Sequence, residues 1–350
     1  MKIFVGMSGG VDSSVTAAIL QKQGHDVSGI TLRLLDKDAN AVADAKQVCG
    51  FLGIEHFVLD LRQTFQERVM DYFSEEYFRA RTPNPCIECN RHIKFGAMLD
   101  FALEHGGEKI ATGHYANLEQ ANGRYAIKKA GFLPKDQSYV LYTLSQHQLA
   151  HSVFPLGNCS KDETRQLAAQ IGLPVAMKKD SQDICFIPDG DYVAFIKDRH
   201  NPPVQPGFFV DHTGAKVGQH TGVWQYTCGQ RKGLGAFGCT MYVKKINPDT
   251  GDIHICPKGG EFSKSCAVEQ LNWVSVEKIE KTVQAQIKIR YGAQPADGVL
   301  HLQENGDVLV EFAQPQRAVT PGQAAVFYNG DVLLGGGRIA IDNGQLTMDN

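Results

Sequence analysis

A glycine- and serine-rich segment near the N-terminus has the composition of a phosphate-binding loop. Residues 6–14 read Gly-Met-Ser-Gly-Gly-Val-Asp-Ser-Ser and stand where the first predicted strand ends and the first predicted helix begins. Adjacent glycines let the backbone approach an anion closely, and serine hydroxyls add donors beside the free N–H groups of a helix N-terminus. The segment lacks the lysine of a Walker A loop and the Gly-x-Gly-x-x-Gly pattern. It predicts a phosphate or pyrophosphate site of another class, the alternative being an ordinary glycine turn with a serine cap.

Three of the nine cysteines lie in settings that favour reactivity. Cys86 and Cys89 form a C-x2-C pair in a proline-stiffened stretch before a predicted helix, close to Arg91 and Lys94. The positive end of a helix dipole and nearby cations favour thiolate over thiol, so we expect a reactive cysteine here. Cys185 lies 96 positions after Cys89 (185 minus 89), again just before a turn.

The cysteine spacing leaves three interpretations open. A structural zinc site needs two more ligands at comparable spacing, and the chain has no second C-x2-C. Buried structural thiols, and redox or sulfur chemistry, are the other two. Because an odd number of cysteines is scattered over a long chain, unlike the dense frameworks of small secreted proteins, we expect reduced thiols.

Apolar runs that alternate with amphipathic stretches predict the elements that position these residues. The first two hundred residues follow a βαβαβ pattern, which predicts a doubly wound parallel sheet with helices on its faces. Leu32 would lie at the carboxyl edge of this sheet, where nucleotides bind in such folds. Strands are expected at 2–7, 27–34, 56–61 and 109–112, and helices at 11–23, 41–52, 93–104, 139–149 and 162–171.

The pattern changes near residue 200, where three prolines in five positions break any helix. Beyond this point short predicted strands, such as the one at 283–291, alternate with turn signals. The expected fold class is therefore α/β: a parallel-sheet domain at 1–200, a small β-rich central domain at 201–267 and a C-terminal β-barrel at 268–350.

The overall charge excludes few partners. The chain has 35 Lys and Arg against 38 Asp and Glu, a net charge of −3, so a nucleic acid would have to be bound by local charge. Four cations and no acid occur between 122 and 135, and seven cations face two acids between 197 and 245, although such runs are also typical of solvated faces. Because no apolar run approaches about 20 residues and no signal sequence is recognisable, we expect a cytoplasmic protein without a membrane partner.

Several motifs occur together in the order found in one enzyme family. The loop at 6–14 resembles the S-G-G-x-D-S motif of the PP-loop ATP pyrophosphatases, which cleave ATP between its α and β phosphates. Taken with several further motif matches, this loop makes the chain resemble the bacterial tRNA-specific 2-thiouridylases over essentially its whole length. These matches lie at 84–86, 89–90, 112–116, 135–138, 181–186, 229–234, 321–323 and 334–337.

The resemblance implies a PP-loop, adenine nucleotide hydrolase-like catalytic domain and ATP-dependent 2-thiolation of the wobble uridine, position 34, of tRNA. The C2 oxygen is adenylated and replaced by sulfur from a cysteine persulfide, with release of AMP and pyrophosphate. Cys89 is implied as the nucleophile and Cys185 as the persulfide carrier, and the two can finish as a disulfide. The implied ATP site consists of Gly6, Met7, Ser8, Gly9, Gly10, Val11, Asp12, Ser13, Leu32 and Gly113. The implied contacts to the base and the tRNA are Asn84, Pro85, Cys86, His114, Lys135, Asp136, Gln137, Arg290, Tyr291 and Gln323.

The same resemblance implies ATP with Mg²⁺, the anticodon stem-loop of tRNA, and a persulfide donor such as a cysteine desulfurase or a sulfur-relay protein. No resident metal site is assigned. Asp12 is a candidate either for holding Mg²⁺ or for capping the helix, and His114 or Asp183 for moving protons. Some family members have Asp where this chain has Cys86, so this chain carries a third thiol able to enter disulfide exchange.

Other function classes make different demands on the same residues. A PP-loop amidating ligase would adenylate a carboxylate and need no paired reactive cysteines. A nucleotide-sensing or RNA-binding module would hold ATP without turnover. A thiol oxidoreductase would leave the loop at 6–14 unexplained.

Overall fold

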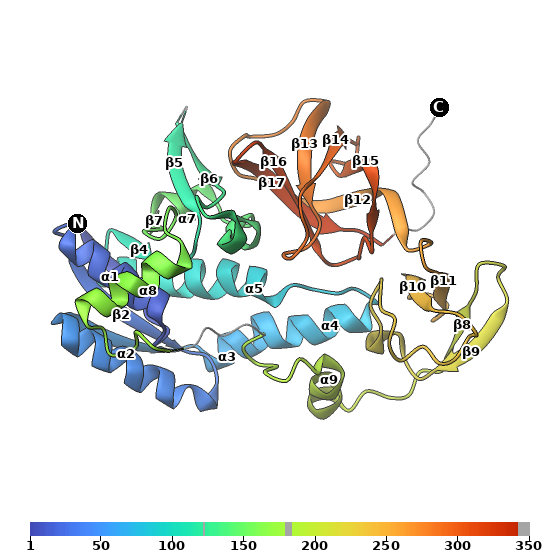
Figure 1. Ribbon diagram of the computed structural model, residues 1–350, viewed down its shortest axis with the longest axis horizontal. Helices are drawn as coiled ribbons and strands as arrows, with labels where there is room; N and C mark the ends of the chain where they lie inside the picture. The colour runs from blue at the N-terminus through green and yellow to red at the C-terminus, as the bar shows by residue number, and fades with distance from the viewer. Residues whose placement is uncertain (122, 179–183, 342–350) are drawn as a thin grey trace.

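The computed structural model describes residues 1–121, 123–178 and 184–341. Figure 1 shows an α/β body at the N-terminal end, a barrel near the C-terminus, and a small β body beside the barrel. Helices α4 (Tyr72–Phe78) and α5 (Pro85–Glu88) extend from the α/β body toward the two β bodies (Figure 1).

A five-stranded parallel sheet forms the centre of the α/β body, with the strand order β3-β2-β1-β4-β7. The strand order reverses between β1 and β4, and α/β sheets bind ligands at the carboxyl ends of the strands at such a switch point. The strands are β1 (Lys2–Gly6), β2 (Asp26–Arg33), β3 (Glu55–Asp60), β4 (Lys109–Ala111) and β7 (Ser152–Val153).

Helices cover both faces of the sheet, which confirms the predicted doubly wound arrangement. One face packs against α1 (Val11–Lys22), α2 (Ala39–Leu52) and α8 (Lys161–Ile171), and the other against α6 (Met98–Glu104). Gly53 ends α2 in the left-handed conformation that glycine adopts readily. The remaining helical elements are α3 (Arg62–Phe65), α7 (Gln146–Ala150), α9 (Tyr192–His200), the π-helical η2 (Gln66–Asp71) and η3 (Cys89–Ala97), and the 3-10 turns η1 (Asp36–Asp38), η4 (Leu133–Lys135), η5 (Ser138–Leu141) and η6 (Val223–Gln225).

The prediction of one continuous helix at 139–149 is wrong. The segment forms η5 and α7 instead, because Ser145 begins a new helix. The Ser145 hydroxyl accepts from the Gln148 N–H at 3.2 Å, and the Gln148 side chain accepts from the Ser145 N–H at 2.9 Å. This capping box satisfies both donors and separates the two helical pieces.

The helix predicted at 93–104 begins earlier than expected. Asn84 is its N-cap and accepts from the Cys86 N–H at 3.1 Å, and Pro85 occupies the first turn. From Pro85 the chain stays helical through α5, η3 and α6 to Glu104. Cys89 therefore lies one turn inside the helix, at the start of a nine-residue π-helical run, a geometry that is frequent at functional sites.

Six antiparallel strands close into the C-terminal barrel, which confirms this part of the predicted fold. Their order is β12-β15-β14-β13-β16-β17, and β12 also pairs with β17 to complete the ring. The hairpin of β5 (Asn117–Ala121) and β6 (Arg124–Lys128) adds to β17 through the pair Val332 and Lys128. The barrel strands are β12 (Phe262–Trp273), β13 (Thr282–Lys288), β14 (Ala296–Leu302), β15 (Val308–Arg317), β16 (Ala324–Asn329) and β17 (Val332–Ile339).

The small central body is a four-stranded sheet with the order β10-β11-β8-β9. Its strands are β8 (Gly207–Val210), β9 (Lys216–His220), β10 (Met241–Ile246) and β11 (Ile253–Pro257). The central part of the chain is thus β-rich, as expected. Since β12 runs across residue 267, the exact division into 1–200, 201–267 and 268–350 stays a prediction.

Buried charges connect the barrel to the helices that lead to the cysteines. Arg338 of β17 lies 3.4 Å from Glu76 and 3.5 Å from Glu88, two carboxylates that are almost fully buried. Arg81 pairs with Glu269 of β12 at 3.0 Å. These ion pairs fix the barrel against α4 and α5. None of the described helices combines the length and the apolar composition that a membrane crossing requires.

Candidate active site

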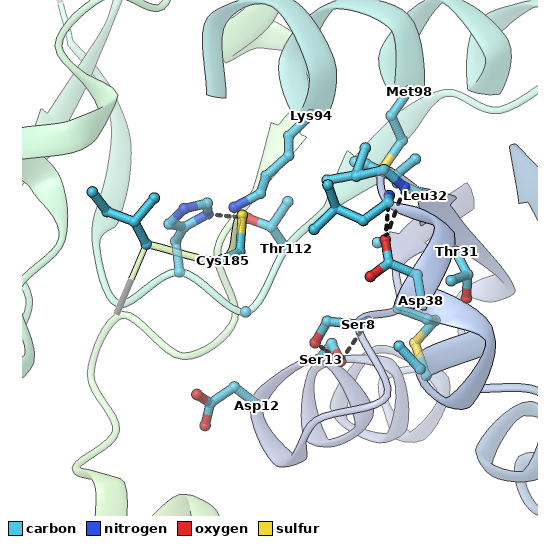
Figure 2. A pocket seen from close by; sticks show the side chains of 18 of the residues that line it. Ser8, Asp12, Ser13, Thr31, Leu32, Asp38, Lys94, Met98, Thr112 and Cys185 are labelled. Atoms are coloured by element: carbon cyan, nitrogen blue, oxygen red, sulfur yellow. Dashed lines mark hydrogen bonds between the residues drawn. The ribbon is translucent and has the colours of Figure 1, made fainter. Parts of the chain in front are cut away.

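A cavity of about 940 Å³ lies at the carboxyl ends of β1, β2 and β4, at the switch point of the sheet. Four segments contribute to its wall: the loop after β1, the segment after β2, the segment around Cys185, and the continuous helix at 85–104, called the helical rod below (Figure 2). The lining residues are Gly6, Met7, Ser8, Asp12, Ser13, Thr31, Leu32, Leu34, Leu35, Lys37, Asp38, Ala41, Lys94, Met98, Thr112, Gly113, His114, Gln137, Ile184, Cys185 and Pro188.

The loop at 6–14 forms the floor of the cavity and is shaped by its own contacts. Gly9 has a φ of +66°, and a Cβ there would lie 2.7 Å from the carbonyl oxygen of Ala41, so only glycine fits. The Ser8 N–H donates to Ser13 Oγ at 3.2 Å. Helix α1 begins after Gly10 without a side-chain cap, which leaves the donors of its first turn available to an anion.

Asp12 does not cap helix α1, so the prediction of a capping role is wrong. Its carboxylate accepts from the Tyr115 hydroxyl at 2.8 Å and from Lys161 Nζ at 2.7 Å. Asp12 and Asp38 are the two carboxylates among the described lining residues. Carboxylate oxygens are ligands that suit Mg²⁺, so the cavity has a donor set that fits this ion beside a nucleotide.

Leu32 and Gly113 both line the cavity at the carboxyl edge of the sheet, and their role in nucleotide binding stays a prediction. Leu32, near the end of β2, contributes to the cavity wall. A Cβ at Gly113 would lie 3.0 Å from the Asp12 Cβ and 3.1 Å from the Ser13 nitrogen. Glycine thus lets the chain after β4 pass close to the start of α1. Gly9, Gly10 and Val11 are absent from the wall, and their role in nucleotide binding stays a prediction.

The structure brings Cys86, Cys89 and Cys185 into one neighbourhood as free thiols. Cys89 is 9% exposed and packs in the same apolar cluster as Phe186 and Ile187, which directly follow Cys185. Cys86 and Cys185 are exposed. The pKa of Cys89 is raised to about 12, chiefly by burial and in smaller part by Cys185 and Cys86, which places all three sulfurs within electrostatic range.

The prediction that a cysteine of this helix is a thiolate is wrong for the protein without substrates. Desolvation raises the pKa of Cys185 to about 11, with a further contribution from Cys86, and it also raises the pKa of Cys86. Lys94 acts in the opposite direction on all three thiols, but its effect is smaller than that of desolvation. At neutral pH these groups are therefore protonated thiols.

His114 lines the cavity as a neutral imidazole. It is buried, and burial lowers its pKa well below the usual value, with a further lowering by Lys94. Its Nδ1 lies 2.8 Å from the Thr112 hydroxyl, a contact drawn in Figure 2. A neutral imidazole can accept a proton or donate a hydrogen bond to a base in the cavity.

Most of the other residues implied in base and tRNA contact lie outside the described cavity wall. Gln137 belongs to the wall and accepts from the Tyr115 N–H at 3.0 Å. The Asp136 carboxylate is buried and accepts from the Ala130 N–H at 3.0 Å and the Ser138 hydroxyl at 2.8 Å, so its observed contacts are structural. The residues absent from the wall are Asn84, Pro85, Cys86, Cys89, Lys135, Asp136, Arg290, Tyr291 and Gln323.

The barrel nevertheless reaches the cysteine segment. Tyr291 is 44% exposed, and its pKa is raised by burial and by the charges of Asp136 and Cys86. Its ring lies 5.5 Å from Lys288 Nζ and 6.2 Å from the ring of Tyr139. An aromatic face is thus available to a base beside Cys86.

The basic run between 122 and 135 is not a free cationic patch. Arg124 pairs with Glu277 at 3.9 Å and Lys128 with Glu119 at 3.2 Å. Lys129 donates to the carbonyl oxygen of Gly330 at 2.8 Å. Arg124 and Lys129 join the hairpin to the barrel, whereas Lys128 pairs within the hairpin. Local sequence cannot reveal the first two contacts, because their partners are distant in the chain.

The described residues provide no zinc site, and the proposed proton carrier Asp183 is not among them. Within the described ranges, no group of three or more His, Cys, Asp and Glu side chains is arranged to hold a metal ion, so the zinc interpretation gains no support. The first three residues of the motif at 181–186, Asp183 among them, lie outside the described residues. The sequence reasoning did not assign Thr31, Asp38 and Lys94 to the site, although their positions at the end of β2 and after Cys89 were available signals.

Comparison with known proteins agrees with this geometry. The family described as "tRNA methyl transferase HUP domain" matches residues 1–189, the "tRNA methyl transferase PRC-barrel domain" matches 194–257, and the "Aminomethyltransferase beta-barrel domain" matches 263–339. The chain is 48% identical to the tRNA-specific 2-thiouridylase MnmA of Heliobacterium modesticaldum, with 96% of this chain and 92% of that protein covered. It is 45% identical to the protein of that name from Acetivibrio thermocellus, with 97% and 99% covered. Identity to the Clostridioides difficile protein is 42%, with 97% and 98% covered. The chain belongs to the tRNA-specific 2-thiouridylase family.

Proposed function

We propose that this protein is a tRNA-uridine 2-sulfurtransferase that thiolates the wobble uridine, position 34, of tRNA at C2 with consumption of ATP. One observation carries the proposal. A single cavity joins the glycine- and serine-rich loop at the switch point of the sheet to the Cys185 thiol, with Cys89 buried next to the Cys185 segment. A site that only binds ATP has no use for this pair of thiols.

In the first step, the loop from Gly6 to Ser13 binds the ATP phosphates through backbone and hydroxyl donors, and Leu32 and Gly113 bound the nucleotide. The uridine O2 forms a bond to the α-phosphorus, and pyrophosphate leaves with the electron pair of the broken P–O bond. Mg²⁺ bound with ATP supplies positive charge to the phosphates. The proton lost from N3 of the base passes to His114 or to water.

In the second step, a persulfide on Cys185 attacks C2, a C–S bond forms, and AMP leaves with the electron pair of the C–O bond. The Cys89 thiol then loses its proton to water and attacks the Cys185 sulfur, and the S–S bond to the transferred sulfur breaks toward the base, which regains a proton at N3. The transferred sulfur is reduced, and the two thiols are oxidised to a Cys89–Cys185 disulfide. Release of the sulfur before its attack on C2 gives the same balance.

The tRNA side of the proposal rests on the barrel and the cysteine helix. Asn84, Pro85 and Cys86 would address the target base, and Tyr291 is placed to stack on it. Further contacts to the anticodon stem-loop would come from Lys135, Asp136, Gln137, Arg290 and Gln323. A persulfide-donating protein must transfer a sulfur atom to Cys185, which is exposed in the structure. We propose that the reaction takes place in the cytoplasm.

The test is a reconstituted assay with ATP, Mg²⁺, a persulfide donor and unmodified tRNA, followed by mass spectrometry of the nucleosides. We expect sulfur at C2 of the wobble uridine, and none with Cys89→Ser or Cys185→Ser, while ATP binding survives in both variants. Cys239→Ser is the matched control, because Cys239 is an exposed thiol of the central part of the chain. An amidating ligase would remain active in the Cys185 variant, and a sensor would release no tRNA-dependent pyrophosphate. Either result refutes the proposal.

A further inference from the structure

Lys94 contributes an ammonium group to the wall of the cavity. Its side chain is half-buried, and among the described residues no ion pair or hydrogen bond engages Nζ. By contrast, Lys161 is paired with Asp12 at 2.7 Å, and Lys178 with Asp44 at 2.6 Å. A partly desolvated cation without an anion is costly, so this position is suited to a negative charge that forms or binds in the cavity.

The π-helical run explains why Lys94 faces the thiols. Lys94 follows Cys89 by five positions inside η3. In an α-helix, at 3.6 residues per turn, residues five apart point about 140° away from each other. In a π-helix the i to i+5 hydrogen bond places the later residue about one turn above the earlier one. The unusual helix thus brings the ammonium group to the cysteine side of the rod.

The direction of the side chain distinguishes sulfur from phosphate. In Figure 2 the Lys94 ammonium points toward Cys185 and Thr112, whereas Ser8 and Ser13 of the phosphate loop lie on another part of the wall. The charge of Lys94 also lowers the pKa of each of the three thiols. These observations agree that the cation lies within electrostatic range of the sulfur atoms.

We propose that Lys94 is a further catalytic residue, which stabilises the negative charge on the sulfur carried by Cys185. The inference rests on the proposed function and deepens it. No bond to Lys94 forms: the sulfur loses its proton to water, and the ammonium group stays protonated beside the anion while the new C–S bond forms. The competing anion is a phosphate of the nucleotide.

Other charges also face Cys185 and must be separated from that of Lys94. The Cys86 thiol and the Asp38 carboxylate disfavour an anion at Cys185, whereas Lys37 favours it. Lys37 is exposed at the same cavity, and its effect on Cys185 is smaller than that of Lys94. It therefore provides a matched control in which one cation of the cavity is removed.

The decisive measurement is the pH midpoint for alkylation of Cys185 by iodoacetamide. Full-length protein carrying Cys86→Ser and Cys89→Ser leaves one thiol of the cluster, which is followed by mass spectrometry of its peptide. We expect Lys94→Met to raise the midpoint by about one pH unit or more, Lys94→Arg to keep it near the background value, and Lys37→Met to shift it less. Lys94→Gln provides a second neutral variant if the methionine protein does not fold. An unchanged midpoint in a folded neutral variant overturns the proposal.

A second measurement separates the two anions. With the natural cysteines present, Lys94→Met should lower the kcat of thiolation about 100-fold, as does the loss of a single group that stabilises a developing anion, while the Kd for ATP stays unchanged. Weaker ATP binding with an unchanged alkylation midpoint assigns Lys94 to the phosphates and overturns the proposal. Because the alkylation midpoint requires no turnover, it also separates this inference from the proposed function.

Discussion

Gln323, directly before β16, donates a hydrogen bond of 2.8 Å from Nε2 to the backbone carbonyl of Thr82, two residues ahead of Asn84. In return, the Thr82 N–H donates to the carbonyl of Pro321 at 2.8 Å. The Thr82 hydroxyl lies 2.9 Å from that of Thr227 in the central part of the chain. The chain just before the cysteine helix is therefore held from two sides by the β bodies. Binding of an RNA to the barrel would be connected to the cysteines through these contacts.

Gln323→Ala tests whether this contact is structural. Loss of one hydrogen bond that leaves a backbone carbonyl without its partner should lower the free energy of unfolding by about 1 kcal/mol. Urea unfolding measures this change, with Gln316→Ala as the control, because the Gln316 side chain bonds only to its near neighbour Gln314 at 2.8 Å on the surface. Unchanged stability with weaker tRNA binding would show that Gln323 serves the RNA directly.

Arg338→Ala should destabilise the protein by about 3 kcal/mol. The substitution leaves Glu76 and Glu88 buried without this counter-charge, and breaking a buried pair costs far more than losing an exposed one. Arg79→Ala is the matched control, since Arg79 also pairs with Glu76 but its side chain is 63% exposed, and its loss should cost less than about 1 kcal/mol. Thermal and urea unfolding distinguish the two variants. Equal losses would contradict the role of burial.

Gly9→Ala should weaken ATP binding at least about tenfold, because the added Cβ would meet the Ala41 carbonyl at 2.7 Å and the backbone there is left-handed. Gly24→Ala separates the effect of backbone strain at a positive φ from the effect of a steric clash of the added Cβ. Gly24 also has a positive φ, of +83°, but nothing lies within 4 Å of its added Cβ. We expect Gly24→Ala to cost about 1 kcal/mol of stability and to leave the Kd for ATP unchanged. Isothermal calorimetry compares them, and similar ATP affinities would refute the assigned role of Gly9.

The buried thiol of Cys266 should make the protein sensitive to alkaline pH. Burial in the barrel raises its pKa from 9.0 to about 12. Below pH 9 the thiol is protonated in both the folded and the unfolded state. Between pH 9 and 12 the unfolded state loses this proton while the folded state keeps it, so the free energy of unfolding falls by about 1.4 kcal/mol per pH unit.

Urea unfolding at pH 8 and pH 10.5 checks this expectation against Cys266→Ala. The difference in stability between the natural protein and the variant should shrink as the pH rises, because the variant has no thiol to ionise. A difference that is constant across this range would show that the Cys266 pKa is not raised.

Local patterns in the sequence predict the parts of the fold that depend on neighbouring residues. The period of apolar residues and the glycines at 6–14 place the sheet, its first helices and the loop, because these choices depend on contacts within a few positions. The same reasoning fails at 139–149, where the Ser145 and Gln148 capping box overrides the helical pattern. It also fails for the basic run at 122–135, whose partners Glu277 and Gly330 lie far along the chain.

The chemistry of the cysteines shows the same division. Residue types and their spacing are enough to predict the fold class, the loop at the first strand and a C-x2-C pair with a distant third cysteine. Packing of distant segments buries Cys89 one turn inside a helix, where desolvation outweighs the nearby cation and keeps the thiols protonated. Packing also turns Lys94 into the cavity, where none of the described residues pairs with its ammonium group. Burial and electrostatic range are properties of packing between distant segments, and no local pattern encodes them.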